Sequence, residues 1–499
     1  MSEVATKHLP EGWAEAQLSE LTERITKGST PTSYGYEYKT EGVKFVKAEN
    51  IDATGHATTT SNFIDNETHE FLSRSKLKEN DLLFSIAGTI GRVGVVRDID
   101  LPANTNQALA IIRLIENSLD IKYLFYFLNS PQIQAVAIKN IVGVGRANLS
   151  LKNIGEFRIP VAPPEQQERI VAKIEELFSH IDVGIEALKK AKQLLKQYRQ
   201  SVLKAAVTGE LTKEWREANK DDAQGSANVA GGRTPGATKL EPAFQLLERI
   251  LKERRQKWEQ QQLEQFKAKG KMPKDDKWKG KYKEPVFEGH ADLEVCKDWA
   301  YVSLDMIPDA IDPNPSHRMP KYVDKGIPFI STDNFEGQNE IDFSKGKKVA
   351  KETYKNLIEK YYIEKGDFAF SRIGTIGKTR LLPTDREYCL SHSLSVIKIK
   401  FSEVCSNYLR HVMSSKDILK QALHGVQSVG VPDLGMAKIR NFEIPFPSLK
   451  EQELISEIIG VKTESITRLE NELEHQLIKA EKNKQSILAS AFSGKITNG

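Results

Sequence analysis

The sequence predicts an α+β protein that consists of two related globular modules, each followed by one long α-helix. Three observations lead to this prediction. The second half of the 499-residue chain repeats the first, so that Leu149–Thr212 aligns without a gap with Leu434–Thr497. Short runs rich in β-branched and aromatic residues precede helical runs within each half. Apolar residues spaced by alternating fours and threes then follow in each half.

The repeat extends over several separate segments. Gly42–Gly55 matches Gly326–Gln338, and the motif Phe-Ser-x-x-Gly-Thr-Ile-Gly begins at Phe84 and again at Phe370. Chance similarity does not keep register over so many segments, so we interpret the chain as a tandem duplication. Two unrelated domains of one fold class are the other interpretation, which explains the shared motifs less well.

Composition limits the class of protein. Hydrophobic residues make up 39% of the chain and charged residues 28%, with a net charge of +4, which is typical of a soluble protein with real cores. No apolar run approaches the ~18 residues of a membrane helix, and the first residues lack the apolar segment of a signal peptide. The three cysteines (Cys296, Cys389, Cys405) form no Cys-x-x-Cys pair, which argues against a structural zinc site. We therefore expect a cytoplasmic protein without a membrane partner.

Each module is expected to contain strands, one helical run and a tight turn. The expected strands are 43–49, 81–88, 108–114, 327–332, 367–374 and 394–400. Apolar and polar residues alternate in 81–88 and 367–374, which predicts strands with one buried face. Residues 121–138 have helical spacing. Gly88 and Gly91, like Gly374 and Gly377, mark a tight turn. A phosphate-binding loop is excluded because it needs a glycine at the position of Arg372.

Two long helices are the strongest local prediction. Pro164 suits the first position of one helix, Ser448 and Glu451 form a capping box for the other, and Gly209 and Gly494 suit the helix ends. The first apolar seam is Ile170, Ile174, Leu177, Ile181, Gly184, Leu188, Ala191, Leu195, Tyr198, Val202 and Ala205. The second is Ile455, Ile459, Lys462, Ile466, Leu469, Leu473, Gln476, Ala480, Asn483 and Ile487. Rods of roughly 70 Å exceed what one module can cover, so we expect their seams to pack together rather than each on its own module.

These features divide the chain into five parts. They are a first module (1–163), a first helix (164–212), a linker with a basic helical central region (213–290), a second module (291–447) and a second helix (448–499). Between Lys239 and His290 there are 14 Lys and Arg against 9 Asp and Glu, interleaved with Trp278 and Tyr282. This stretch is either a solvated connector or a surface for a partner protein or DNA phosphates.

No catalytic constellation is present in the sequence. There is no Asn-Pro-Pro-aromatic motif for adenine methylation, and the sequence of Asp312–His317 does not match it. No glycine-rich nucleotide fingerprint and no pair of histidines with metal-ligand spacing occur. The chain is therefore predicted to be a binding protein and not an enzyme. Two diverged modules joined by paired helices suit a reader of two separated DNA half-sites.

The motif order resembles the specificity subunit of Type I restriction–modification systems. Leu-Pro-Glu-Gly-Trp, the repeated Gly-Thr-Ile-Gly turn, Phe-x-Ile-Pro and "SVLKAAVTGELT" carry the resemblance over nearly the whole chain. It implies that each module is a target recognition domain and that the helices pair as an antiparallel coiled coil. It also implies a bipartite, asymmetric site in double-stranded DNA, two docked methyltransferase subunits and two motor-nuclease subunits. S-adenosylmethionine, ATP and Mg²⁺ would belong to those partners, and no cofactor to this chain.

Three other functions remain open from the residues alone. The chain could serve a split Type II system with a fused methyltransferase–nuclease. It could be a coiled-coil adaptor without a DNA role, or an enzyme with a novel site in its modules. DNA affinity with the salt dependence of phosphate contacts would distinguish a DNA reader from an adaptor.

Candidate DNA-binding residues follow from the duplication. Matched residues of the repeated turn are candidates for phosphate contacts, the alternative being a purely structural turn. They are Thr89, Arg92, Arg372, Thr375 and Lys378. Diverged polar residues are candidates for reading bases. In the first module these are Lys47, Asn50, Asn106, Gln107, Arg146 and Asn148. In the second module they are Thr332, Asn334, Ser391, His392, Gln427 and Ser428.

Overall fold

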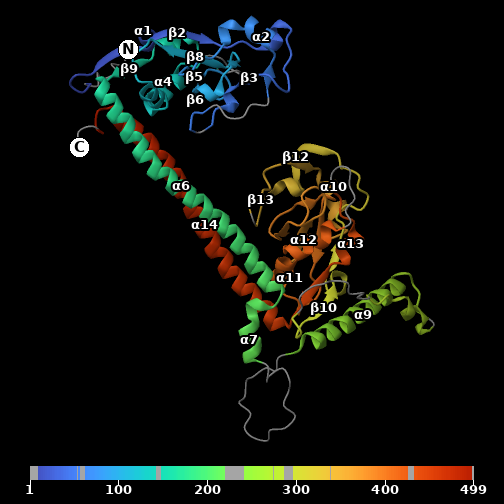
Figure 1. The fold of residues 1–499 in the computed structure, drawn as a ribbon. Helices are drawn as coiled ribbons and strands as arrows, with labels where there is room; N and C mark the ends of the chain where they lie inside the picture. Colours follow the sequence, from blue (N-terminus) through green and yellow to red (C-terminus); the bar gives the residue numbers. More distant parts are fainter. Residues whose placement is uncertain are drawn as a thin grey trace. The chain divides into compact units, whose positions relative to one another are not determined.

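A computed structural model describes residues 9–52, 54–56, 62–141, 148–219, 241–273, 275–285, 296–337, 339–424 and 432–496. The chain forms two compact units. Unit 1 contains Met1–Ala191 and Glu472–Gly499, and unit 2 contains Lys192–Asn471. Each unit therefore holds one globular module together with parts of both long helices (Figure 1). Among the helices that the structure describes, none is both long and apolar enough to cross a membrane.

The module of unit 1 contains two small sheets. A four-stranded antiparallel sheet has the order β2–β8–β5–β6, and a three-stranded sheet has the order β4–β3–β7 with β3 and β7 parallel. The strands are β2 (Thr22–Lys27), β3 (Val43–Val46), β4 (Phe63–Ile64), β5 (Leu82–Ser85), β6 (Val93–Val95), β7 (Ala103–Thr105) and β8 (Leu109–Leu114). The helices are α1 (Leu18–Leu21), α2 (Asn66–Phe71), α3 (Ile121–Leu128), α4 (Pro131–Lys139) and α5 (Leu151–Gly155).

The module of unit 2 repeats this topology. Its sheets have the orders β11–β19–β16–β17 and β15–β12–β18, with β12 and β18 parallel, and it adds the hairpin β13–β14. The strands are β11 (Asp309–Ile311), β12 (Tyr322–Ile330), β13 (Phe335–Glu336), β14 (Glu340–Ile341), β15 (Lys347–Val349), β16 (Phe368–Ser371), β17 (Thr379–Leu381), β18 (Cys389–Leu390) and β19 (Leu394–Lys398). The helices are α10 (Lys351–Ile358), α11 (Ser406–Met413), α12 (Lys416–Leu423) and α13 (Met436–Arg440).

One further strand pair closes each module next to its long helix. In unit 1, β1 (Ala14–Gln17) pairs antiparallel with β9 (Arg158–Val161). In unit 2, β10 (Ala300–Ser303) pairs with β20 (Glu443–Phe446) in the same way. The pairing holds the start of each module against the segment that leads into its long helix.

The expected strands are present, but two details of the sequence prediction are wrong. Strands β5 and β16 were each expected to bury one face, and all four residues of each strand are buried. Phe84 faces a core that includes Tyr123, whereas Leu83 packs in a smaller cluster with Val46, so both faces of the sheet are covered. The helical run 121–138 is two helices, because the chain breaks before Pro131 at the start of α4.

The two long helices are α6 (Pro164–Val207) and α14 (Leu449–Ala491) (Figure 1). Pro164 begins α6 as predicted, and the left-handed residues Gly209 (φ 80°) and Gly494 (φ 75°) follow the two helix ends. Within unit 2, Thr212 contacts Glu451 and Arg199 contacts Glu470, so the two helices run in opposite directions there. In unit 1, Asp182 contacts Lys484 across 2.5 Å.

The buried stripe of these helices departs from the predicted heptad. Tyr198 was expected in the seam and is 46% exposed, whereas the neighbouring Arg199 is 9% exposed. On α14, Leu469 is 49% exposed, whereas the side chain of Glu470 is 25% exposed. A strict 3.5-residue repeat drifts by about 20° per heptad on a straight helix. The stripe therefore shifts by one residue, and the shift brings Arg199 and Glu470 together.

The central region folds onto the module of unit 2. Helix α7 (Lys213–Ala218) follows α6, and α9 (Ala243–Ala268) buries Leu246 and Ile250 in the core of the module. The segment around Trp278 turns back onto α9, where Trp278 stacks on Trp258 with ring centroids 6.0 Å apart. The helix predicted here is confirmed, and the aromatic residues of the basic stretch pack on it.

Candidate nucleic-acid interface

The repeated turn connects neighbouring strands of the four-stranded sheet in each module. Its glycines have left-handed backbones, with φ between 74° and 94°. The hydroxyl of Ser85 accepts the N–H of Arg92 at 2.7 Å, and that of Ser371 accepts the N–H of Lys378 at 2.8 Å. A Cβ at Gly91 would overlap the side chain of Gln134. The expected tight turn is confirmed. The same turn occurs in both modules because the left-handed glycines and the serine hydroxyl are both needed to form it.

The polar residues of the turn differ between the modules. Thr89 and Thr375 are exposed. Arg92 donates to the carbonyl oxygens of Ala48 at 2.9 Å and Ile51 at 3.2 Å, so its guanidinium ties the turn to the neighbouring loop. The side chain of Lys378 is exposed and has no polar partner in the part of the chain that is described. The side chain of Lys378 is thus exposed at the turn, whereas that of Arg92 is engaged inside its module.

The residues expected after the strands β3 and β12 are largely used within their modules. Asn50 accepts the N–H of Lys47 at 2.9 Å, and the Nζ of Lys47 donates to Asn62 at 3.1 Å. Asn334 is buried, and its amide donates to the carbonyl oxygens of Asp342 and Lys345 at 2.9 Å each. The side chain of Thr332 is half-buried. Asn334 therefore holds the loop of β13 and β14 in place.

Three predicted residues of the first module lie close to the turn. Asn106 accepts the N–H of Ala108 at 3.1 Å. Gln107 is exposed and accepts a hydrogen bond from the hydroxyl of Thr30. Asn148 is exposed, and its backbone pairs with Ala87 of the turn. The predicted residues Arg146, Gln427 and Ser428 lie outside the described residues.

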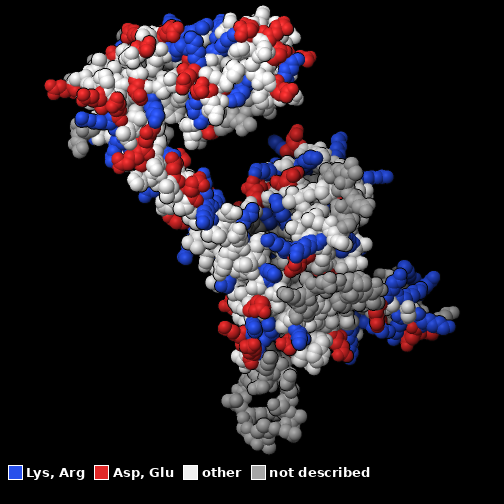
Figure 2. Space-filling model, in the orientation of Figure 1, with Lys and Arg blue, Asp and Glu red and all other residues white. Residues whose placement is uncertain are grey.

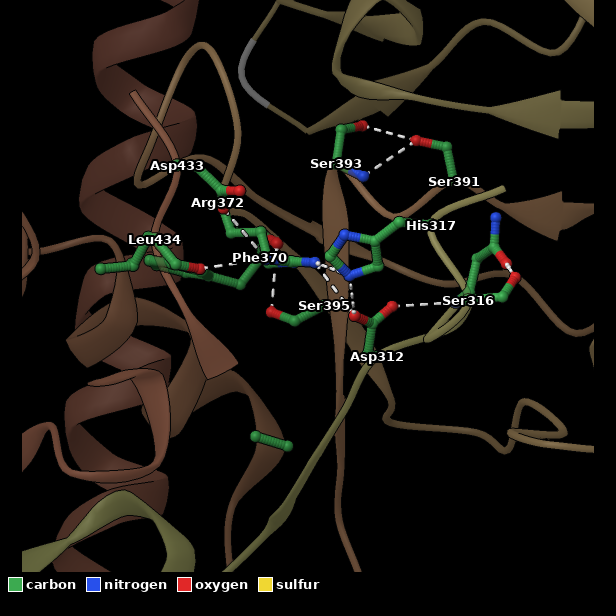
Figure 3. Close-up of polar contacts among 12 residues, drawn as sticks. Asp312, Ser316, His317, Phe370, Arg372, Ser391, Ser393, Ser395, Asp433 and Leu434 are labelled. Atoms are coloured by element: carbon green, nitrogen blue, oxygen red, sulfur yellow. Dashed lines mark hydrogen bonds and ion pairs between the residues drawn. The ribbon is translucent and has the colours of Figure 1, made fainter. Parts of the chain in front are cut away.

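Arg372 is the centre of a polar cluster in the second module (Figure 3). It is 2% exposed and lies between the carboxylates of Asp312 at 3.0 Å and Asp433 at 3.1 Å. Its guanidinium also donates to the carbonyl oxygen of Leu434 at 3.2 Å and lies 3.3 Å from Nε2 of His317. A buried arginine is tolerated because two carboxylates offset the loss of its hydration.

Two histidines cover this cluster. The rings of His317 and His392 are stacked with centroids 5.2 Å apart, and Nε2 of His317 lies 3.1 Å from Asp312. Burial lowers the pKa of His392, and the nearby His317 and Arg372 lower it further. Ser391 is buried and shares a hydrogen bond with Ser393 at 2.7 Å. The structure thus brings the predicted Arg372, Ser391 and His392 together.

Sequence reasoning missed Asp312, His317 and Asp433 as parts of this cluster. The turn-rich sequence after β11 was a signal for a structured polar loop, but it does not reveal which residues the loop faces. Among the residues described, no group of three or more His, Cys, Asp and Glu could hold a metal ion. Figure 2 shows Lys and Arg mixed with Asp and Glu over the visible face of each module, and many basic side chains over α9.

Comparison with known proteins assigns the family. Residues 10–196 and again residues 296–479 match the family model for the Type I restriction modification DNA specificity domain. The chain belongs to this family. The match covers both modules and most of both long helices, so the resemblance seen in the sequence is confirmed.

Individual members of this family have less than 30% of their aligned residues in common with this chain. The Type I restriction enzyme EcoBI specificity subunit of Escherichia coli is 29% identical over 226 residues, 44% of this chain and 47% of that one. The EcoDI specificity subunit of E. coli is 22% identical over 372 residues, 72% of this chain and 68% of that one. The chain spans about half the length of the EcoBI and EcoKI subunits that it matches.

A solved structure shares the fold of the whole chain. It comes from work on complex assembly and conformational transition of the type I R-M system. The two chains superpose with a TM-score of 0.60 at 16% sequence identity, over 98% of this chain and 99% of that one. The α+β fold of the whole chain is therefore shared with that protein.

Proposed function

We propose that this chain is the DNA-recognition subunit of a Type I restriction–modification complex and that it is not itself an enzyme. Each module would read one half of a bipartite, asymmetric site in double-stranded DNA. The observation that carries the proposal is the duplication of one scaffold with different polar residues in its loops. Ile86 and Arg372 illustrate this, because they differ in chemistry but make the same backbone hydrogen bonds. Each donates its N–H to the residue before β8 or β19 and accepts the N–H of a leucine that follows α4 or α12.

The two long helices would form an antiparallel coiled coil that sets the length of the unread DNA between the half-sites. The opposed direction of α6 and α14 in unit 2 supports this role, as does the partly buried ion pair of Arg199 and Glu470. The five parts expected from the sequence would then act as two recognition domains, two spacer helices and a central region. A change in helix length would change the spacing between half-sites.

The catalytic parts of the complex would come from other subunits. Two methyltransferase subunits would bind the helical regions and methylate one adenine in each half-site. Two motor-nuclease subunits would join them for restriction. S-adenosylmethionine, ATP and Mg²⁺ would be held by these partners in the cytoplasm. A split Type II system would replace the separate subunits by one fused methyltransferase–nuclease.

Phosphate contacts and base contacts would come from different residues. Thr89, Thr375 and Lys378 are exposed at equivalent turns and would contact phosphates, which position a protein without reading sequence. The remaining predicted residues on loops would contribute to base reading where their side chains are free to do so. The engaged side chains of Arg92, Asn334 and Arg372 would instead hold these loops in position.

The proposal is tested by reconstitution. The full chain is mixed with the methyltransferase encoded beside it, S-adenosylmethionine and a library of random double-stranded DNA, and methylated adenines are mapped. A two-part motif with a fixed gap is expected, and it must disappear when this chain is omitted. Methylation that does not depend on the chain, or a motif with one continuous part, would contradict the proposal. A methyltransferase that binds the chain without any DNA affinity would favour the adaptor function.

A further inference from the structure

Gln107 and His392 occupy the same place in the two modules. Each lies two residues before a leucine that opens a central strand, Leu109 of β8 or Leu394 of β19. Those leucines pair with Ser85 and Ser371, the serines of the repeated motif. The backbone is therefore equivalent at both positions, although one residue carries an amide and the other an imidazole.

In the first module, a second loop comes close to this place. Gly28 follows β2 and donates its N–H to Leu109 at 3.2 Å, and Ser29 donates to Thr105 at 3.0 Å. A Cβ at Gly28 would overlap the carbonyl oxygen of Thr105, so only glycine allows this approach. The approach brings the hydroxyl of Thr30 into hydrogen-bonding contact with Gln107.

In the second module, the loop after β11 approaches His392, the residue equivalent to Gln107, through a histidine. Asn314 is 2% exposed and organises the loop through hydrogen bonds to Asp312 at 2.9 Å and Arg318 at 3.0 Å. The loop holds His317 in a left-handed conformation with φ 52°, stacked on His392. Non-glycine residues in this conformation are uncommon and require support from the surrounding structure.

The second junction has the properties of a binding surface. The side chain of His317 is 49% exposed although its ring is fixed by Asp312, Arg372 and His392. The Nδ1 atom of His392 is buried and has no hydrogen-bond partner among the residues described. Buried polar atoms are almost always satisfied, so an unsatisfied one points to a missing partner. Arg372 positions the pair and is itself covered.

We propose that each module reads bases of its half-site at this junction of two loops. Thr30 and Gln107 would carry the reading in the first module, and His317 and His392 in the second. The inference rests on the proposed DNA-recognition function and adds Thr30 and His317 to the reading residues. The ligand is the major-groove edge of a base pair. A glutamine amide can pair with the donor and acceptor of adenine, and an imidazole N–H suits an acceptor such as guanine N7 or O6.

The test compares variants at the two junctions in the reconstituted methylation assay. His317→Gln and His392→Gln form one set, and Thr30→Val and Gln107→Glu form the other. Asn356→Ala on α10 is the matched control, because Asn356 is exposed in the second module and lies outside the junction. All variants are assayed as full chains with their partner, and their binding to the methyltransferase confirms that they fold.

We expect each set to change one half of the methylated motif and leave the other half unchanged. At one or two base positions of that half, the preference for the wild-type base should fall roughly 10- to 100-fold. The Asn356→Ala chain should give the wild-type motif. Histidine variants that methylate the wild-type motif at a reduced rate would overturn the inference, because a structural role alters rate and not base choice. If the chain without any substitution yields no bipartite motif, the proposed function itself is overturned.

Discussion

The indole nitrogen of Trp299 donates a hydrogen bond to the carboxylate of Glu451 across 2.9 Å. The equivalent pair in unit 1 is Trp13 and Gln166, whose atoms lie 2.8 Å apart. Both pairs join the residue before the first strand of a module to the first turn of its long helix. In unit 2 the acceptor is a carboxylate. It also accepts hydrogen bonds from the hydroxyl of Thr212 and the guanidinium of Arg216, which lie in the segment after α6, each at 2.6 Å. Glu451 thus joins the module to both helices.

Substitution of Glu451 should weaken unit 2 because it removes the carboxylate that pairs with the largely buried guanidinium of Arg216. We expect Glu451→Ala to lower the free energy of unfolding by about 3 kcal/mol, and Glu451→Gln by less, because an amide still accepts from Trp299. Urea unfolding of the full chain measures both. Gln166→Ala is the control in unit 1, because no arginine among the described residues contacts Gln166. Equal losses for Glu451→Ala and Gln166→Ala would show that the charge of Glu451 contributes nothing.

The pair of Arg199 and Glu470 should couple the two long helices energetically. Their side chains are 11% and 25% exposed and 2.9 Å apart. A double-mutant cycle with Arg199→Met and Glu470→Gln is expected to give a coupling energy of about 1–2 kcal/mol in urea unfolding. A coupling energy near zero would mean that the helices do not rely on this contact.

Lys378 and Arg92 hold matched positions but should respond differently to truncation. Lys378→Ala should reduce the slope of DNA affinity against salt concentration by about 1, with an unchanged methylation motif. Arg92→Ala should instead lower the stability of unit 1 by about 1–3 kcal/mol, because it removes hydrogen bonds to the carbonyls of Ala48 and Ile51. Affinity measured from 50 to 200 mM salt distinguishes the two. A changed motif in Lys378→Ala would assign it to base reading.

His411 should make the second module sensitive to acid. Burial, together with the charge of Arg410, lowers the pKa of His411 to about 3 from its ordinary 6.5. Between these values the unfolded chain binds a proton that the folded chain does not, so stability falls as the pH falls through this window. We expect a loss of about 2 kcal/mol between pH 7 and pH 5 from this group.

The matched variant is His411→Tyr, because Tyr126 holds the equivalent place in the first module. Tyr123 and Tyr408 fix this equivalence, since each donates its hydroxyl to the carbonyl of a proline, on β9 in the first module and on the equivalent β20 in the second. Urea unfolding at pH 7 and pH 5 should show a smaller difference for His411→Tyr than for the parent chain. An equal difference would assign the acid sensitivity to other groups.

Much of the fold follows from sequence periodicity alone. The strands around Phe84 and Phe370, the helix starts at Pro164 and the glycine stops were predictable, because each depends on residues close together in the chain. The one-residue shift that buries Arg199 in place of Tyr198 was not predictable. Tyr198 continues the apolar seam in the sequence, and nothing short of its partner Glu470 on the other helix indicates that Arg199 is buried.

The candidate site was less accessible to sequence reasoning. Arg372 could be singled out because it interrupts a repeated motif. Its partners Asp312 and Asp433 come from loops more than fifty residues away on either side, and only the order of β11, β19 and β16 brings them to one place. Their contacts depend on strand pairing, which periodicity does not reveal.

Adenine methylation of the whole host genome, mapped with and without this gene, tests the central claim most directly. The claim that the chain selects a bipartite site predicts a split motif, with one methylated adenine in each half, that is present in the parent strain and absent from the deletion strain. Restoring the gene must restore the motif. A methylome that is the same in both strains, although the methyltransferase is expressed and active, would contradict the claim.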